Sequence, residues 1–162
     1  MKYVELNATV NNISGVISAQ AYLQLLPRLA PGLPAGARAF ATDPQHYDFY
    51  SRRCVKDLTI DALSFRGDDG QLTIEITFGH NCWKHEENLV ITYSGVSTYE
   101  LRLEDGTSNW TNLKPVILDE VLPHDHGCTH EIACRAGTLT IVSTDLVASW
   151  VPANCPQQPT AR

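Results

Sequence analysis

Hydrophobic and polar residues alternate along most of the chain from about residue 54 onward. Between Leu72 and Phe78 every second residue is apolar, which is the period of a β-strand with one buried face. The turn-forming residues 67–70, GDDG, separate this run from Leu58 and Ile60, so the region predicts a β-hairpin. Six to eight short strands predict a mostly antiparallel sheet, either strongly curved or folded into a sandwich. The further strands are predicted at 89–93, 99–103, 116–122, 128–134, 139–141 and 146–150.

The first 50 residues follow a different period. Counting from Tyr22, apolar residues recur at offsets of three, four and seven, which is one face of a helix over residues 19–30. Ser18 is the expected N-cap, and Pro27 is expected to kink or end the helix. Residues 31–36, PGLPAG, are typical of a turn. This helical segment is expected to cover an open face of the sheet.

No linker divides the chain into separate domains. The pair Asp43–Pro44 suits the start of a second, short helix. We therefore expect one α+β domain over residues 1–151, with a helical and loop segment at 1–50 and a β-rich body at 51–151. The prolines and glutamines of residues 152–162 predict a frayed tail.

The composition is that of an ordinary globular domain. The chain has 162 residues, of which 43% are hydrophobic and 19% charged, and a folded chain of this length needs no metal or disulfide to hold its core. No apolar run approaches the roughly 20 residues of a membrane-spanning helix, so no membrane association is expected. The N-terminal residues MKYVELN lack the apolar centre of a signal peptide, which favours a cytoplasmic location.

Five cysteines are present, at positions 54, 82, 128, 134 and 155. Their number is odd and no two are spaced as C-x-x-C, a pattern that favours reduced thiols over a disulfide framework. All five thiols are therefore predicted to be free in the native protein.

Acidic residues are concentrated between positions 104 and 131. Six carboxylates minus one lysine give this segment a balance of −5, in a chain whose net charge is −6. Such a segment disfavours nucleic acid, whose phosphates need basic residues, and favours a basic protein or a cation. The alternative is an ordinary solvated surface. The carboxylates predicted to face a basic partner protein are Asp119, Glu120, Asp125 and Glu131.

The densest group of potential metal ligands lies at residues 124–134, HDHGCTHEIAC. Imidazole and thiolate are ligands that zinc and other transition metals prefer. Donors two apart on a strand can converge and donors four apart cannot, so Gly127 would have to turn the chain for a site to form. The alternative is a polar loop, small core cysteines and a hydrogen-bonded strand histidine. The candidate ligands are His124, His126, Cys128 and His130, with His80, Cys82 and His85 as further candidates.

No strong catalytic signature is present. The chain lacks G-x-G-x-x-G, the P-loop, G-x-S-x-G and H-E-x-x-H. Cys82 lies between His80 and His85, an order that suits a thiolate nucleophile beside a base, but spacing alone establishes neither an activated thiol nor a group that orients the base. No catalytic residue is therefore assigned.

The last two thirds of the chain contain five short sequence segments that carry a resemblance to known proteins. They are KDLTI at 56–60, LVITYSGV at 89–96, DEV at 119–121, GCTHEI at 127–132 and GTLTI at 137–141. This pattern resembles a loose group of small bacterial α+β proteins that includes immunity proteins of polymorphic toxin systems. The resemblance implies an inhibitor or binding module and carries over no site residue.

These observations predict a protein-binding module, of the kind of an immunity protein that inhibits a basic toxin, without a cofactor. The alternative is a metal-binding protein or small metal-dependent enzyme that holds zinc or another transition metal with residues 124–134. The two differ in what they require. An inhibitor needs an exposed acidic or aromatic patch, whereas an enzyme needs a concave site where titratable groups converge.

Overall fold

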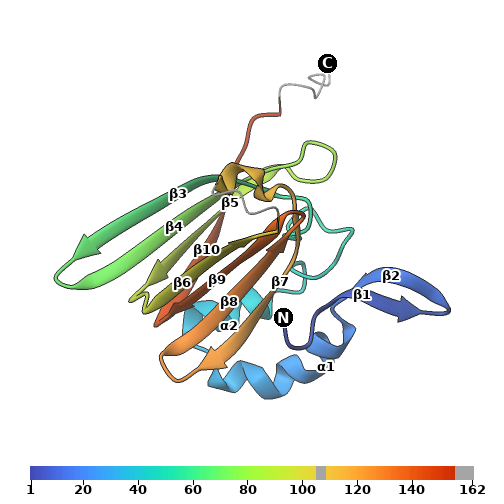
Figure 1. Ribbon diagram of the computed structural model, residues 1–162, viewed down its shortest axis with the longest axis horizontal. Coiled ribbons are helices and arrows are strands. Elements are labelled where there is room, and N and C mark those ends of the chain that lie inside the picture. Colours follow the sequence, from blue (N-terminus) through green and yellow to red (C-terminus); the bar gives the residue numbers. More distant parts are fainter. Residues whose placement is uncertain (105–108, 156–162) are drawn as a thin grey trace.

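The computed structural model combines two short α-helices near the N-terminus with antiparallel β-structure (Figure 1). It describes residues 1–104 and 109–155. The α+β class predicted from the sequence is confirmed. In chain order the elements are β1 (Glu5–Val10), β2 (Ile13–Ser18), α1 (Gln20–Leu29), the 3-10 turn η1 (Ala30–Gly32), α2 (Ala35–Ala41), β3 (Thr59–Asp68), β4 (Gln71–Gly79), β5 (Glu87–Ser94), β6 (Thr98–Leu103), the 3-10 turn η2 (Trp110–Leu113), β7 (Val116–His124), β8 (Gly127–Cys134), β9 (Gly137–Ser143) and β10 (Asp145–Pro152).

Eight strands form two four-stranded antiparallel sheets, ordered β10-β5-β4-β3 and β6-β9-β8-β7. The predicted β3–β4 hairpin is present and pairs from Thr59 with Gly79 to Asp68 with Gln71. Its two turn residues, Asp69 and Gly70, have φ values of 45° and 77°. Positive φ at both turn residues gives the twist that a two-residue hairpin needs.

One hydrophobic cluster contains the buried faces of both sheets. In β4 the buried residues Ile74, Ile76 and Phe78 alternate with half-buried polar residues, as the sequence pattern predicts. In β8 the same alternation buries Cys128, His130 and Ile132. The two faces therefore contribute to a shared core, and the one histidine among these residues is enclosed with its apolar neighbours.

Helix α1 spans Gln20–Leu29, within the predicted range 19–30. It runs through Pro27 to Leu29, so the proline does not end it. The hydroxyl of Ser18 accepts the backbone N–H of Gln20 at 3.3 Å, although Ala19 is the residue that precedes the first helical turn. The hydroxyl of Tyr22 donates to the carbonyl of Val121 at 2.7 Å, which joins the helix to β7.

Helix α2 begins inside the segment that was expected to be a turn, and residues 43–50 form turns in place of the expected short helix. A contact from a distant strand accounts for the position at which α2 begins. The carboxylate of Asp145, at the start of β10, accepts the backbone N–H groups of Gly36 (3.0 Å) and Ala37 (2.9 Å). These are donors that the first turn of a helix leaves unpaired, so β10 caps α2.

The β1–β2 hairpin was not predicted. Its turn residues, Asn11 and Asn12, have φ values of 50° and 66°, and asparagine is one of the few residues that accept this conformation. Within residues 1–104 and 109–155 the two strands pair with each other and with no other strand. Figure 1 shows the hairpin extending away from the two larger sheets.

The short segment that follows β10 is joined to the β4–β5 connection by a disulfide between Cys82 and Cys155, whose Cα atoms are 5.8 Å apart. The prediction of five free thiols is therefore wrong for this pair, because the fold brings together positions that are 73 residues apart in sequence. The other three cysteines are free and buried. Of the predicted tail, residues 156–162 lie outside the described residues. None of the helices described is long and apolar enough to cross a bilayer.

Candidate functional site

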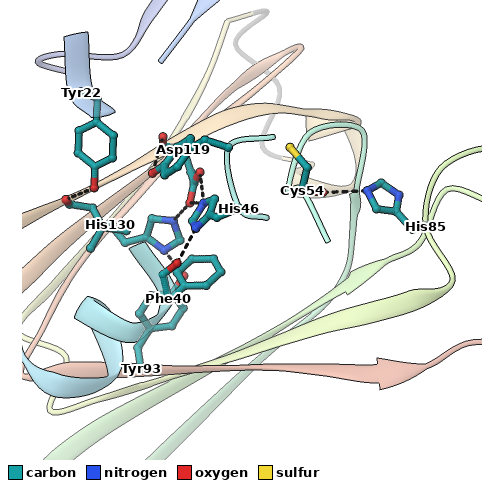
Figure 2. Close-up of polar contacts among 10 residues, drawn as sticks. Tyr22, Phe40, His46, Cys54, His85, Tyr93, Asp119 and His130 are labelled. Carbon is teal, nitrogen blue, oxygen red and sulfur yellow. Dashed lines mark hydrogen bonds and ion pairs between the residues drawn. The ribbon is translucent and has the colours of Figure 1, made fainter. Parts of the chain in front are cut away.

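Titratable side chains converge around the carboxylate of Asp119, in the middle of β7 (Figure 2). The Nε2 atom of His46 lies 2.8 Å from Oδ1 and 3.0 Å from Oδ2 of this carboxylate. The Nε2 atom of His130, on β8, lies 2.7 Å from Oδ2. All three residues are only 1% exposed. We refer to Asp119, His46, His130 and Tyr93 as the buried polar network.

The partners of His46 fix its protonation state. Its Nε2 faces the Asp119 carboxylate, and its Nδ1 lies 2.9 Å from the backbone carbonyl of Phe40. A carboxylate and a carbonyl only accept hydrogen bonds, so both ring nitrogens of His46 must donate. His46 is therefore an imidazolium that forms a buried ion pair with Asp119.

The electrostatics of the pair agree with this assignment. Burial disfavours the charged form of His46, but the Asp119 charge and its hydrogen bond outweigh burial and raise the pKa of His46 above its ordinary value. Burial likewise disfavours the Asp119 carboxylate, but the His46 charge and hydrogen bonds from both histidines outweigh it and hold the pKa of Asp119 well below its ordinary value. Each partner thus stabilises the charged form of the other.

His130 links the network to the other sheet. Its Nδ1 lies 2.7 Å from the hydroxyl of Tyr93, on β5. Burial, reinforced by the Asp119 charge, raises the pKa of Tyr93 well above its ordinary value, so the phenol keeps its proton beside Nδ1. At the other ring nitrogen, Nε2–H of His130 donates to the Asp119 carboxylate. A chain of hydrogen bonds therefore runs from β5 through β8 to β7.

Aromatic rings enclose the His46 end of the network. The rings of His46 and Tyr47 stack with centroids 4.1 Å apart. The Phe40 ring is tilted against the same imidazole, also with a centroid separation of 4.1 Å. Each buried side-chain nitrogen and oxygen among the described residues has a hydrogen-bond partner. The contacts of these enclosed groups are all made within the protein, so the network joins separate elements of the fold.

A second buried carboxylate, Glu120, holds the N-terminal segment. Its Oε1 accepts the backbone N–H of Lys2 at 2.6 Å, and its Oε2 accepts those of Tyr3 (2.6 Å) and Val4 (2.7 Å). Hydrogen bonds to a charged acceptor are about twice as strong as neutral ones. Glu120 therefore fixes the segment that leads into the β1–β2 hairpin.

The four carboxylates predicted to bind a partner are thus separated by the fold. Asp119 and Glu120 are buried and fully engaged within the protein. Glu131 is partly exposed and lies 2.7 Å from the amino group of Met1. Asp125 is exposed, at the β7–β8 turn. The structure does not bring these residues together into one acidic surface.

The four main metal-ligand candidates are not brought together either. His124 and His126 are exposed at the β7–β8 turn, with ring centroids 5.7 Å apart. Cys128 and His130 point into the core, where the Cys128 thiol lies 3.7 Å from Ser143 and His130 binds Asp119 and Tyr93. The chain reverses direction at this turn, which carries His124 and His126, and the alternation of β8 then directs Cys128 and His130 into the core.

The three additional metal-ligand candidates, His80, Cys82 and His85, lie in different environments. His85 is buried, donates from Nε2 to the carbonyl of Cys54 at 2.8 Å and accepts the backbone N–H of Asn81 at Nδ1. Burial is the main cause that lowers the pKa of His85, in keeping with a neutral ring whose nitrogens are both occupied. His80 and Cys82, in contrast, lie next to each other and to Cys155.

Sequence reasoning missed two residues of the network, His46 and Tyr93, and did not connect Cys155 with Cys82. Tyr93 shares the parity of Leu89 and Ile91, which indicates an inward-facing side chain but no partner. His46 follows the Asp43–Pro44 pair in an irregular segment, where no pattern indicates burial.

Comparison of the chain with protein-family models, with curated proteins and with solved structures finds no match. The function therefore has to be inferred from the residues and geometry of the protein itself.

Proposed function

We propose that this protein is a protein-binding module that docks through the β1–β2 hairpin, residues 5–18, which we call the docking hairpin. The observation that carries the proposal is its exposed apolar surface on strands that, in the part of the chain that the structure describes, pair only with each other. Ile13 is 64% exposed, and Leu6 and Val10 are each 38% exposed. An isolated two-stranded hairpin is marginally stable in water, so one that presents apolar side chains gains from a partner.

The free edges of the hairpin support the same role. Soluble proteins protect exposed strand edges with lysine, proline or inward-pointing charge. Residues 5–18 contain no lysine and no proline, and Glu5 is their one charged residue. Each strand therefore offers unpaired backbone groups, together with apolar side chains, to an extended segment of another protein. This is the geometry of β-strand addition, in which main-chain hydrogen bonds supply affinity and side chains supply specificity.

A hollow of about 450 Å³ at the base of the hairpin extends this surface. Its lining includes Ile17 at the end of β2, Leu23 of α1, and the aromatic residues Tyr47 and Phe49. Apolar and aromatic side chains that gather beside an exposed edge are typical of the central part of a binding surface. On this proposal the hairpin and hollow bind together, and the two larger sheets form a sandwich, partly covered by the helices, that carries them.

The partner that we propose is a toxin with a basic surface, so that the protein acts as an inhibitor of the immunity type. A net charge of −6 favours the approach of a basic protein, while the nearly uncharged hairpin makes the close contact. This division differs from the expectation that Asp119 and Glu120 face the partner, since both are buried.

The proposal is tested with a photo-crosslinking amino acid at position 13 of the full chain, expressed in its native cells. The matched control carries the same group at Val147, which is also exposed but lies on β10. We expect one crosslinked partner from position 13 and none from position 147. The partner, once purified, should bind the wild-type protein, and the Ile13→Asp variant should bind at least tenfold more weakly.

Two results would overturn the proposal. Equal crosslinking from both positions, or none from position 13, would remove the docking role of the hairpin. A crosslinked product of two copies of this chain would remove the toxin partner and make the hairpin a dimer contact instead.

A further inference from the structure

Three potential metal ligands meet where the segment that follows β10 lies beside the β4–β5 connection. The Nε2 atom of His80 and the Sγ atoms of Cys82 and Cys155 all lie within 4.8 Å of one another, and all three residues are half-buried. The Cys82 sulfur is 3.4 Å from His80 Nε2. Among the residues described, no other set of three histidine, cysteine or carboxylate donors converges in this way.

The histidine is oriented as a metal-binding histidine would be. Its Nδ1 lies 2.8 Å from Oδ1 of Asn88, an acceptor, so Nδ1 carries the proton and Nε2 presents its lone pair to the sulfurs. The same amide oxygen accepts the backbone N–H of His80 at 2.9 Å. A hydrogen bond that fixes the tautomer and ring orientation in this manner is the usual second partner of a zinc-bound histidine.

The separations suit a zinc ion. With Zn–S bonds of about 2.3 Å and a Zn–N bond of about 2.05 Å, tetrahedral geometry places sulfur and nitrogen about 3.6 Å apart and two sulfurs about 3.8 Å apart. The observed distance of 3.4 Å between Cys82 Sγ and His80 Nε2 is close to the first value. The two sulfurs, now bonded, must separate to reach the second.

We infer that His80, Cys82 and Cys155 form a redox-controlled zinc site, which is closed by the disulfide and opened by its reduction. A thiol reductant supplies the two electrons. Two reductant thiols become one reductant disulfide as the Cys82–Cys155 bond breaks and both sulfurs take up protons. Zinc then binds the two thiolates and the imidazole, and the two thiol protons pass to solvent. A water molecule fills the fourth position.

The main chain keeps the three donors near one another after the disulfide is broken. Strand β10 pairs with β5 as far as Pro152 with Glu87, and the backbone N–H of Ala153 donates to the carbonyl of Glu86 at 3.3 Å. Only Asn154 lies between this contact and Cys155. Cys155 therefore remains beside the β4–β5 connection in both redox states, and zinc replaces one cross-link with another.

The test uses the full chain without an affinity tag, since a histidine tag would itself bind metal. Cobalt(II) is titrated as a spectroscopic substitute for zinc into protein that has been reduced and freed of reductant, and into oxidised protein. We expect one equivalent to bind to the reduced protein, with a thiolate-to-cobalt charge-transfer band and the visible bands of tetrahedral coordination. Zinc should displace the cobalt, and the oxidised protein should bind neither.

Variants separate this site from the other histidines and cysteines. Cys82→Ser and Cys155→Ser should abolish the charge-transfer band or halve its intensity, and His80→Ala should weaken binding at least tenfold. Asn88→Ala should weaken it by about 10- to 100-fold, because it releases the ring of His80. The matched controls, His124→Ala and Cys128→Ser, should bind as the wild type does.

Equal binding by oxidised and reduced protein would overturn the inference, as would binding that is unaffected by His80→Ala or Cys82→Ser. Absence of binding to reduced protein whose circular dichroism remains native would do the same. None of these results bears on the docking hairpin, because the site and the hairpin share no residue.

Discussion

His46 and Asp119 are 73 residues apart in sequence and form an ion pair that is closed off from solvent. The pair joins the irregular segment after α2 to the centre of β7, and His130 and Tyr93 extend the contact to both larger sheets. Burying a charged pair is costly, so such a pair need not add stability relative to an apolar one. The His46–Asp119 pair favours the packing of the segment after α2 against β7 over arrangements that would leave either charge buried alone.

Removing one member of the pair should therefore be strongly destabilising. Asp119→Ala leaves the His46 imidazolium buried without its counter-charge and takes an acceptor from His130. We expect the free energy of unfolding to fall by about 3–5 kcal/mol, measured by urea denaturation at neutral pH. Asp125→Ala, at an exposed turn, should change it by no more than about 0.5 kcal/mol. A loss below about 1 kcal/mol for Asp119→Ala would show that the pair is not buried as described.

The stabilisation by His46 should depend on pH. Because the folded-state pKa of His46 is raised above 6.5, its contribution is fully present below about pH 6.5 and is lost as the pH rises through the folded pKa. The difference in unfolding free energy between the wild type and His46→Asn should therefore be larger at about pH 6 than at about pH 9.

Other groups should not obscure this comparison. The pKa of Asp119 is lowered, so its contribution is lost only as the pH falls below the ordinary carboxyl range, outside the interval compared. The lowered pKa of His85 has the opposite effect on stability, but His85 is present in both proteins and is cancelled in the difference. A difference that is constant, or that grows with pH, would contradict a protonated His46.

The hydroxyl of Tyr93 should contribute measurably, since it joins the two larger sheets. Tyr93→Phe keeps the ring and leaves Nδ1 of His130 buried without its hydrogen-bond partner. We expect a loss of about 1–3 kcal/mol in unfolding free energy. Tyr50→Phe is the control, because Tyr50 is 97% exposed. Equal stabilities for the two variants would exclude the Tyr93–His130 hydrogen bond from the native state.

The carboxylate of Glu120 should control the order of residues 2–4. Glu120→Gln keeps the shape of the side chain but replaces an ionised acceptor by a neutral amide with one oxygen. Amide hydrogen exchange of residues 2–4 should accelerate by at least tenfold, with little change in the strands of the two larger sheets. Glu100→Gln, on the exposed side of β6, is the control. Unchanged exchange in Glu120→Gln would mean that other contacts hold this segment.

The strands could be predicted from the sequence because their period is local. The alternation from Leu72 to Phe78 identifies both the strand and its buried face, and the GDDG segment locates its turn. The N-terminal hairpin was missed because apolar residues within 5–18 do not alternate regularly and its register is interrupted twice. Asn11 and Asn12, a pair that tolerates positive φ, were the available signal.

The site could be predicted only in part, because its residues meet through the fold. The pattern places His130 on a strand, and its partners are on another strand of the sheet and on the opposite sheet. His46 has no periodic context at all. Cys82 and Cys155 meet because β10 pairs with β5, and this pairing follows from the whole topology rather than from any spacing in the sequence.

The self-contained pairing of the docking hairpin has a consequence for how the protein can change. Apart from Ala8, residues 5–15 are exposed, and the core of the molecule begins on either side, at Val4 and Ala19. If this hairpin recognises the partner, selection for a new partner acts on one short segment and selection for stability acts on the rest. Substitutions within the hairpin can then change which partner is bound, while the core that stabilises the two larger sheets is unaffected.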